Sequence, residues 1–109
     1  MTRISTHVLD AVLGKPAAGI NLRLDRMTEG GWSQICLTAT DTDGRCSTPM
    51  PDAEAGTYRI TFNTHEYLGR MGRDSIYPEI SITFNCDGAS HYHLPLLLSD
   101  NSYTTYRGS

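Results

Sequence analysis

Three of the four histidines lie in stretches where apolar residues recur at every second position. Ile4 and Val8 lie four residues apart and share one face of a strand. His7 lies an odd number of residues from both, so its side chain points to the other face. His91 and His93 are two residues apart and share a face, opposite Leu94, Leu96 and Leu98. Because an imidazole titrates near pH 6.5, all three are candidates for proton transfer at neutral pH. The ordinary alternative is a solvated or hydrogen-bonded surface histidine.

The spacing of His91 and His93 also suits two residues that share a metal ion. A catalytic zinc ion usually takes three protein ligands, and no acidic residue or cysteine adjoins this pair in the sequence. We therefore expect no metal, and a metal-dependent protein stays the less favoured alternative. His65 lies in a different segment, and we expect it to be a solvated surface residue.

Arg45 and the end of the chain supply further polar groups. Arg45 follows the turn pair Asp43-Gly44, from which its planar guanidinium could hold an anion or two carbonyl oxygens. A solvated loop arginine is the alternative. The segment 102–109 is strand-like and ends in an arginine, a glycine and a serine, which could close a polar pocket, although chain ends commonly fray.

The elements that must hold these groups are mainly strands. Apolar and polar residues alternate along residues 20–25, 57–62 and 80–85, which predicts strands with one buried face. Between the apolar stretches lie turn signals: Gly14-Lys15-Pro16, Gly30-Gly31, Asp43-Gly44 and Asp87-Gly88. Short strands at this spacing favour an antiparallel sandwich, and the fold class is all-β.

One segment departs from this pattern. Asn63 and Glu66 have the spacing of a helix-capping pair, with Asn in place of the usual Ser or Thr. We predict a short helix over residues 64–71 that ends at Gly72.

Length and charge limit the classes of function. A chain of 109 residues fits a single domain, residues 1–109. Because so small a domain buries a smaller share of its surface than a larger one, we expect a large site to be completed by residues of a second subunit. The net charge of −3 and the scattered basic residues favour neither nucleic acid nor a membrane as a partner. We expect a cytoplasmic protein, with a signal peptide removed before residue 1 as the alternative. The odd number of cysteines, without a CxxC spacing, predicts reduced thiols: Cys36, Cys46 and Cys86.

Four stretches together resemble the transthyretin-related family, in its 5-hydroxyisourate hydrolase branch. The resemblance runs essentially from end to end, in the family's order. The terminal Tyr-Arg-Gly-Ser discriminates best, because it marks the hydrolases and is absent from the hormone carriers. The stretches are Ser5-Thr6-His7-Val8-Leu9-Asp10 with Gly14-Lys15-Pro16-Ala17, Thr42-Asp43-Gly44-Arg45, Tyr77-Pro78-Glu79-Ile80 with residues 92–99, and Tyr106-Arg107-Gly108-Ser109.

This resemblance implies a sandwich of two four-stranded antiparallel sheets with a short helix after the fifth strand. It also implies a homotetramer with active sites at the dimer–dimer interface. The implied reaction is hydrolysis of 5-hydroxyisourate, the unstable product of urate oxidation, to 2-oxo-4-hydroxy-4-carboxy-5-ureidoimidazoline, without metal or organic cofactor.

The resemblance also implies roles for the candidate residues. His7 and His93 would activate water and return a proton, in an order that stays open, and Arg45 would clamp substrate oxygens. Tyr106 and Arg107 would line the ring site, and Ser109 would bond to water or substrate. His91 would stand behind His93 or be a solvated neighbour. The rival interpretation is a transthyretin-like carrier of a small aromatic ligand.

Overall fold

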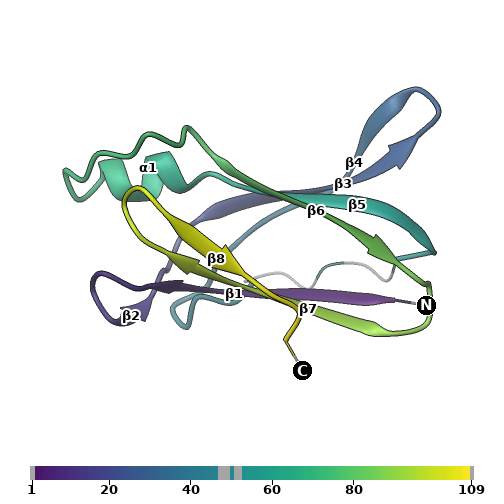
Figure 1. Cartoon of the computed structure of the whole chain (residues 1–109), viewed down its shortest axis with the longest axis horizontal. Coiled ribbons are helices and arrows are strands. Elements are labelled where there is room, and N and C mark those ends of the chain that lie inside the picture. Colours follow the sequence, from purple (N-terminus) through teal and green to yellow (C-terminus); the bar gives the residue numbers. More distant parts are fainter. Residues whose placement is uncertain (1, 47–49, 51–52, 109) are drawn as a thin grey trace.

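The computed structural model describes residues 2–46, 50 and 53–108, and its strands form two stacked four-stranded sheets (Figure 1). The first sheet has the order β2-β1-β7-β8 and the second β4-β3-β5-β6. The first sheet contains β1 (Arg3–Asp10), β2 (Lys15–Pro16), β7 (His91–Leu98) and β8 (Tyr103–Thr105). The second contains β3 (Asn21–Thr28), β4 (Gly31–Ala39), β5 (Gly56–Phe62) and β6 (Ile80–Cys86).

The apolar rows of the alternating segments meet between the two sheets and form the core. The largest fully buried apolar side chains come from both layers: Tyr58, Phe62, Ile20, Leu24, Ile60, Leu68, Ile80, Leu96, Leu98 and Val8. In β1 the residues on either side of His7 in the sequence are buried, whereas His7 itself is half-buried. The predicted division of faces is therefore confirmed, with the histidines of β1 and β7 on the outer face of the first sheet.

The first sheet differs from the prediction in one respect, because β1 and β7 run parallel. β7 follows β6 through the turn at residues 87–90 and crosses from the second sheet to the first, so no hairpin with β1 fixes its direction. All other strand pairs are antiparallel. The parallel register sets Ser5 beside His93 and Arg3 beside His91.

The predicted helix is present after the fifth strand as α1 (Thr64–Gly69). Asn63 caps it, because the side chain of Asn63 accepts a hydrogen bond from the backbone N–H of Glu66 at 3.4 Å. The helix ends two residues earlier than predicted, since the N–H groups of Met71 and Gly72 bond to carbonyls only three residues back. No helix within residues 2–46, 50 and 53–108 is long and apolar enough to cross a membrane.

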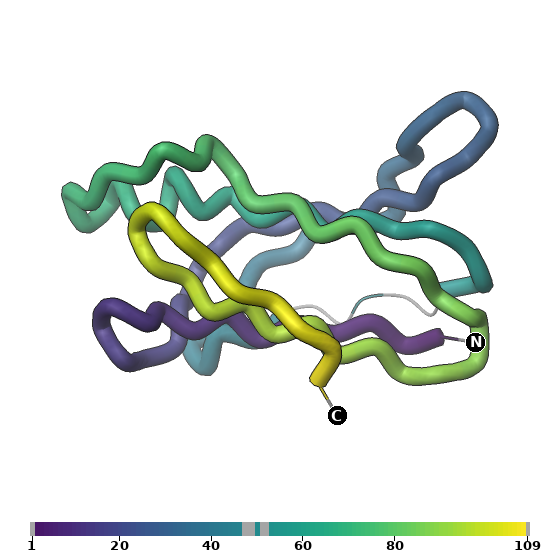
Figure 2. Tube along the Cα trace, viewed as in Figure 1, coloured from purple at the N-terminus to yellow at the C-terminus, as the bar shows by residue number. Residues whose placement is uncertain are grey.

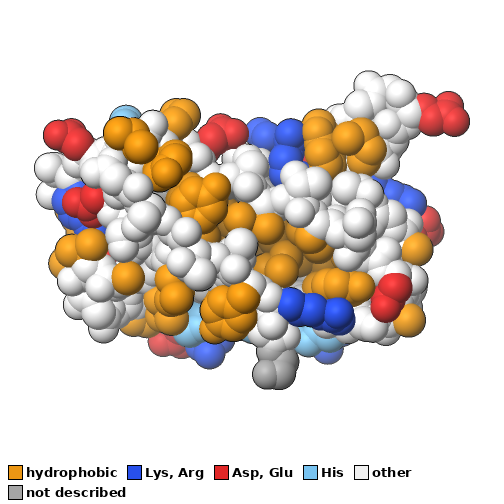
Figure 3. All heavy atoms as spheres, viewed as in Figure 1, with side chains coloured by type: hydrophobic (Ala, Val, Ile, Leu, Met, Phe, Trp, Pro, Cys, Tyr) orange, Lys and Arg blue, Asp and Glu red, His pale blue; other side chains and the backbone are white. Residues whose placement is uncertain are grey.

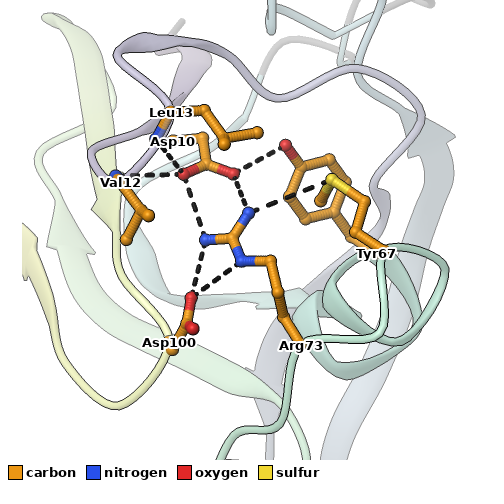
Figure 4. Close-up of polar contacts among 7 residues, drawn as sticks. Asp10, Val12, Leu13, Tyr67, Arg73 and Asp100 are labelled. Carbon is orange, nitrogen blue, oxygen red and sulfur yellow. Dashed lines mark hydrogen bonds and ion pairs between the residues drawn. The ribbon is translucent and has the colours of Figure 1, made fainter.

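A buried ion pair ties the end of β1 to the turn that leads into β8 (Figure 4). Arg73 donates to the fully buried carboxylate of Asp10 at 2.6 Å and to Asp100 at 2.6 Å, and Tyr67 donates to Asp10 at 2.9 Å. Burial alone would raise the pKa of Asp10, but hydrogen bonds from Arg73, Leu13 and Tyr67 outweigh it and lower that pKa. This cluster fixes β1 and the β7–β8 hairpin, which carry the candidate residues.

Candidate active site

Backbone pairing gathers the candidate residues on the outer face of the first sheet. Arg45 pairs with His7 in an isolated antiparallel bridge, and Gly108 pairs in the same way with His93. Ser5 lies beside His93 through the parallel register of β1 and β7. Residues that are far apart in the sequence thus form one continuous strip, and the chain end lies against β7 (Figure 2).

Arg45 is presented by a tight turn that Asp41 organises. The Asp41 carboxylate accepts from the backbone N–H of Asp43 at 2.9 Å and of Arg45 at 3.0 Å. Gly44 has a φ of +79°, and a Cβ atom there would lie 2.3 Å from the carbonyl oxygen of Val8. Only glycine fits this approach, so the predicted turn pair holds Arg45 rigidly against β1.

His7 is anchored through one ring nitrogen. Its Nε2 lies 2.7 Å from the carbonyl oxygen of Asp43, and a carbonyl can only accept, so Nε2 carries the hydrogen. In the neutral imidazole, Nδ1 then holds the lone pair, which is free to accept a proton or a hydrogen bond.

Ser5 connects the two histidines of β7. Its Oγ lies 2.8 Å from Nδ1 of His93 and 2.9 Å from Nε2 of His91. Ser5 was not among the predicted site residues, although it lies on the same strand face as His7. The missing information was the β1–β7 register, which no local pattern reveals. His91 thus contacts His93 through Ser5.

The electrostatic surroundings keep His93 neutral. Burial lowers the pKa of His93 below 6.5, and the electrostatic influence of the nearby His91, His7 and Arg45 lowers it further. Since the pKa falls, His93 holds a free lone pair at neutral pH and can serve as a general base there.

A pocket of about 480 Å³ opens over this strip. That volume falls within the range of small-molecule sites, roughly 300–1,000 Å³. Its lining consists of Arg3, Ile4, Ser5, Thr6, Arg45, Cys46, Met50, His91 and His93. Histidine and arginine side chains emerge together along the corresponding lower edge in Figure 3. His7 is not in the lining but lies next to Arg45.

The C-terminal candidates Tyr106 and Arg107 are not in the lining of this pocket, although Arg107 contacts a residue that lines it. The guanidinium carbon of Arg107 is 4.1 Å from the ring centroid of Tyr92, and Nη2 of Arg107 donates to the carbonyl of His91 at 3.5 Å. Tyr106 is exposed. Neither lines the pocket of its own chain, and Ser109 lies outside the described residues.

The thiols are not activated as nucleophiles. All three cysteines are free, as predicted. Cys46 lines the pocket, yet burial raises the pKa of its thiol to about 11, so it stays protonated at neutral pH. Among the described residues no group of three His, Cys, Asp or Glu side chains could hold a metal ion.

Comparison with known proteins gives one consistent result. The model of the HIUase/Transthyretin family matches residues 4–108. A 5-hydroxyisourate hydrolase from Salmonella dublin is 41% identical over 109 residues, which cover 97% of this chain and 80% of that protein.

Solved structures agree in fold. A 5-hydroxyisourate hydrolase from Klebsiella pneumoniae is 36% identical with a TM-score of 0.82, covering 100% of this chain and 94% of the other. Transthyretin from Sparus aurata is 33% identical with a TM-score of 0.92, covering 97% and 96%. An (S)-allantoin synthase is 30% identical with a TM-score of 0.89; the match covers 99% of this chain but only 44% of that one.

Proposed function

The chain belongs to the HIUase/Transthyretin family, and from this premise we propose that it hydrolyses 5-hydroxyisourate at the pocket beside His7, Arg45 and His93. The observation that carries the proposal is the convergence of two imidazoles and a guanidinium on one strip of the first sheet. Such a set supplies a base and a donor for a developing oxyanion, which an enzyme needs and a carrier does not.

Ring opening requires water to attack an amide-like carbonyl of a flat, polar substrate. The C–O bond forms while a base takes one proton of the water, and the C–N bond of the ring then breaks as its nitrogen gains a proton. The product is 2-oxo-4-hydroxy-4-carboxy-5-ureidoimidazoline. The chain is a hydrolase, and this scheme calls on no metal or organic cofactor.

The three side chains have separate tasks in this proposal. His93, with its lowered pKa and its place in the pocket lining, accepts the proton of the water. His7, whose Nε2 is fixed by Asp43, offers Nδ1 to the substrate or to the water. Arg45 donates two parallel N–H groups to substrate oxygens and opposes the negative charge that forms there.

A carrier is the second candidate, because transthyretin from Sparus aurata has the same fold. The fold alone does not separate the two functions. The curated relatives at about 40% identity are hydrolases, and the ionisable strip favours the same conclusion.

The assembly completes the proposal. We propose a homotetramer with active sites at the dimer–dimer interface, where Tyr106, Arg107 and Ser109 contribute to the walls of the site. The exposed ring of Tyr106 and the small size of the chain support this arrangement. We also propose a cytoplasmic location and one domain over residues 1–109, which cell fractionation and limited proteolysis would test.

The test generates 5-hydroxyisourate with urate oxidase in a large excess over the protein and follows its ultraviolet decay. A hydrolase speeds the decay of all the substrate over many turnovers. A carrier would withdraw at most one equivalent for each site. Decay no faster than the spontaneous rate would overturn the proposal, and loss of activity on chelation would point to a metal at His91 and His93.

A further inference from the structure

Ser5 and His91 are placed so that they could move a proton, although the reaction described above gives them no task. The ring centroids of His91 and His93 are 6.3 Å apart, which is too far for a direct hydrogen bond. The Oγ of Ser5 lies between them, at 2.9 and 2.8 Å from their nitrogens. The hydroxyl therefore links the half-buried imidazole of His93 to the exposed imidazole of His91, both of which line the pocket.

Counting hydrogens leaves two arrangements in which Ser5 accepts from one ring and donates to the other; in a third, both rings donate to Oγ and no proton can pass between them. A serine hydroxyl has one hydrogen to donate and two lone pairs. In the first arrangement Nδ1–H of His93 donates to Ser5, and Ser5 donates to Nε2 of His91. In the second arrangement both hydrogen bonds run the other way: Nε2–H of His91 donates to Ser5, and Ser5 donates to Nδ1 of His93. The first leaves the lone pair of His93 on Nε2, and the second leaves a hydrogen there.

We propose that Ser5 and His91 form a proton relay behind His93, an inference that rests on the proposed function. Nε2 of His93 takes a proton from the attacking water as the C–O bond forms. The Nδ1 proton of His93 passes to Oγ of Ser5, whose own proton passes to Nε2 of His91. His93 ends neutral in its other tautomer, Ser5 is unchanged, and His91 becomes an imidazolium.

The same relay serves the second half of the reaction. His93 now carries its hydrogen on Nε2, which is the form that can protonate the departing ring nitrogen. As it does so, the proton returns from His91 through Ser5 to Nδ1 of His93. Every group regains its starting state, so one histidine acts first as base and then as acid.

Burial of His93 and solvent exposure of His91 favour the transfer away from His93, against the two cationic residues that adjoin His91. His93 is half-buried and faces His91, His7 and Arg45, so a positive charge on it is costly. His91 is exposed, and solvent can stabilise its charge. Two other cationic residues adjoin His91: Arg3 is its partner in register, and Arg107 donates to its carbonyl.

The test compares Ser5→Ala and His91→Gln with Ser5→Thr, which keeps the hydroxyl. We expect kcat to fall roughly tenfold in the first two variants, with KM unchanged. This loss is smaller than the about 10²–10⁴-fold that a general base contributes to the rate. Ser5→Thr should keep most of the activity. In mixtures of light and heavy water, the wild-type kcat should depend on deuterium content along a curve, because several protons move together. In Ser5→Ala and His91→Gln the dependence should become linear.

Matched controls are Ser33→Ala and His65→Gln, since both residues are exposed and lie outside the strip. If Ser5→Ala does not fold, His91→Gln decides the question, because its side chain is exposed. A folded His91→Gln enzyme with wild-type kcat and a curved deuterium dependence would overturn the relay. A wild-type protein that does not accelerate the decay at all would instead overturn the proposed function.

Discussion

Gly108 leaves no room for a side chain beside His93. A Cβ atom at residue 108 would lie 2.7 Å from Cδ2 of the imidazole, closer than real Cβ atoms approach. The backbone N–H of Gly108 also donates to the carbonyl of His93 at 2.7 Å. Ser5 holds the opposite side of the ring through Nδ1. The end of the chain and the first strand together fix this imidazole.

Gly108→Ala should therefore impair catalysis more than stability. The added methyl group must either turn the ring away from Ser5 or lift the chain end from β7, and small misplacements at an active site can cost about 10²-fold. We expect kcat to fall at least tenfold in the ultraviolet assay. Gly30→Ala is the control, because nothing lies within 4 Å of its added methyl. Equal activity of the two variants would contradict this role of Gly108.

The pH dependence of the reaction should reflect the electrostatic surroundings of His93. Because burial and nearby cations lower its pKa from 6.5, the neutral form persists below pH 6.5. The acid limb of kcat/KM should therefore lie below that pH. Arg45→Gln removes one of the cations, so the pKa of His93 should rise and the limb should move to higher pH.

The measurement is kcat/KM for wild type and Arg45→Gln from roughly pH 4.5 to 8. Each profile is normalised to its own maximum, so that only the position of the acid limb is compared. His65→Gln should leave the limb in place, since His65 is remote from the strip. A wild-type limb above pH 6.5, or a shift to lower pH in Arg45→Gln, would be incompatible with the lowered pKa.

Arg73→Met should destabilise the protein strongly. The variant leaves the carboxylate of Asp10, whose side chain is fully buried, without its charged partner. Breaking a buried pair in this way costs about 3–5 kcal/mol. Asp10 has a lowered pKa in the folded state, so its contribution is complete above about pH 3.9 and disappears as the pH falls through the lowered value. Urea unfolding at pH 7 measures the loss.

Arg70→Met is the matched control. Arg70 pairs with Glu66 at 3.0 Å, but both side chains are about half exposed, and such pairs contribute about 0.3–0.5 kcal/mol. If both variants lost similar stability, the cluster of Asp10, Arg73 and Asp100 would not be what fixes β1 to the β7–β8 hairpin.

Much of the fold was predictable from local pattern. Alternation of apolar and polar residues located β3, β5 and β6. The same alternation predicted which side chains of β1 and β7 face the core and which face outward. β4 was not recognised as a strand, because few of its side chains are buried and its apolar residues Ile35, Cys36 and Leu37 are consecutive. The helix end was placed two residues too late, since the three-residue turns after Gly69 have no sequence signature.

The site was predictable in its residue types but not in its connections. His7, Arg45 and His93 were identified as candidates, and the turn glycine Gly44 indicated how Arg45 is held. The hydrogen bonds of Ser5 depend on the pairing of β1 with β7, in which Ser5 lies beside His93, 88 residues later in the sequence. The parallel direction of that pair, which results from the crossover between the sheets, was also beyond local pattern.

We propose that His7, Arg45 and His93 together open the ring of 5-hydroxyisourate. The most direct test measures kcat/KM for His7→Ala, Arg45→Ala and His93→Ala, with His65→Ala as control and the oligomeric state checked by size-exclusion chromatography. We predict that each of the three variants loses at least tenfold in activity while the assembly persists and the control retains wild-type activity. Near-normal activity in all three variants would contradict the account.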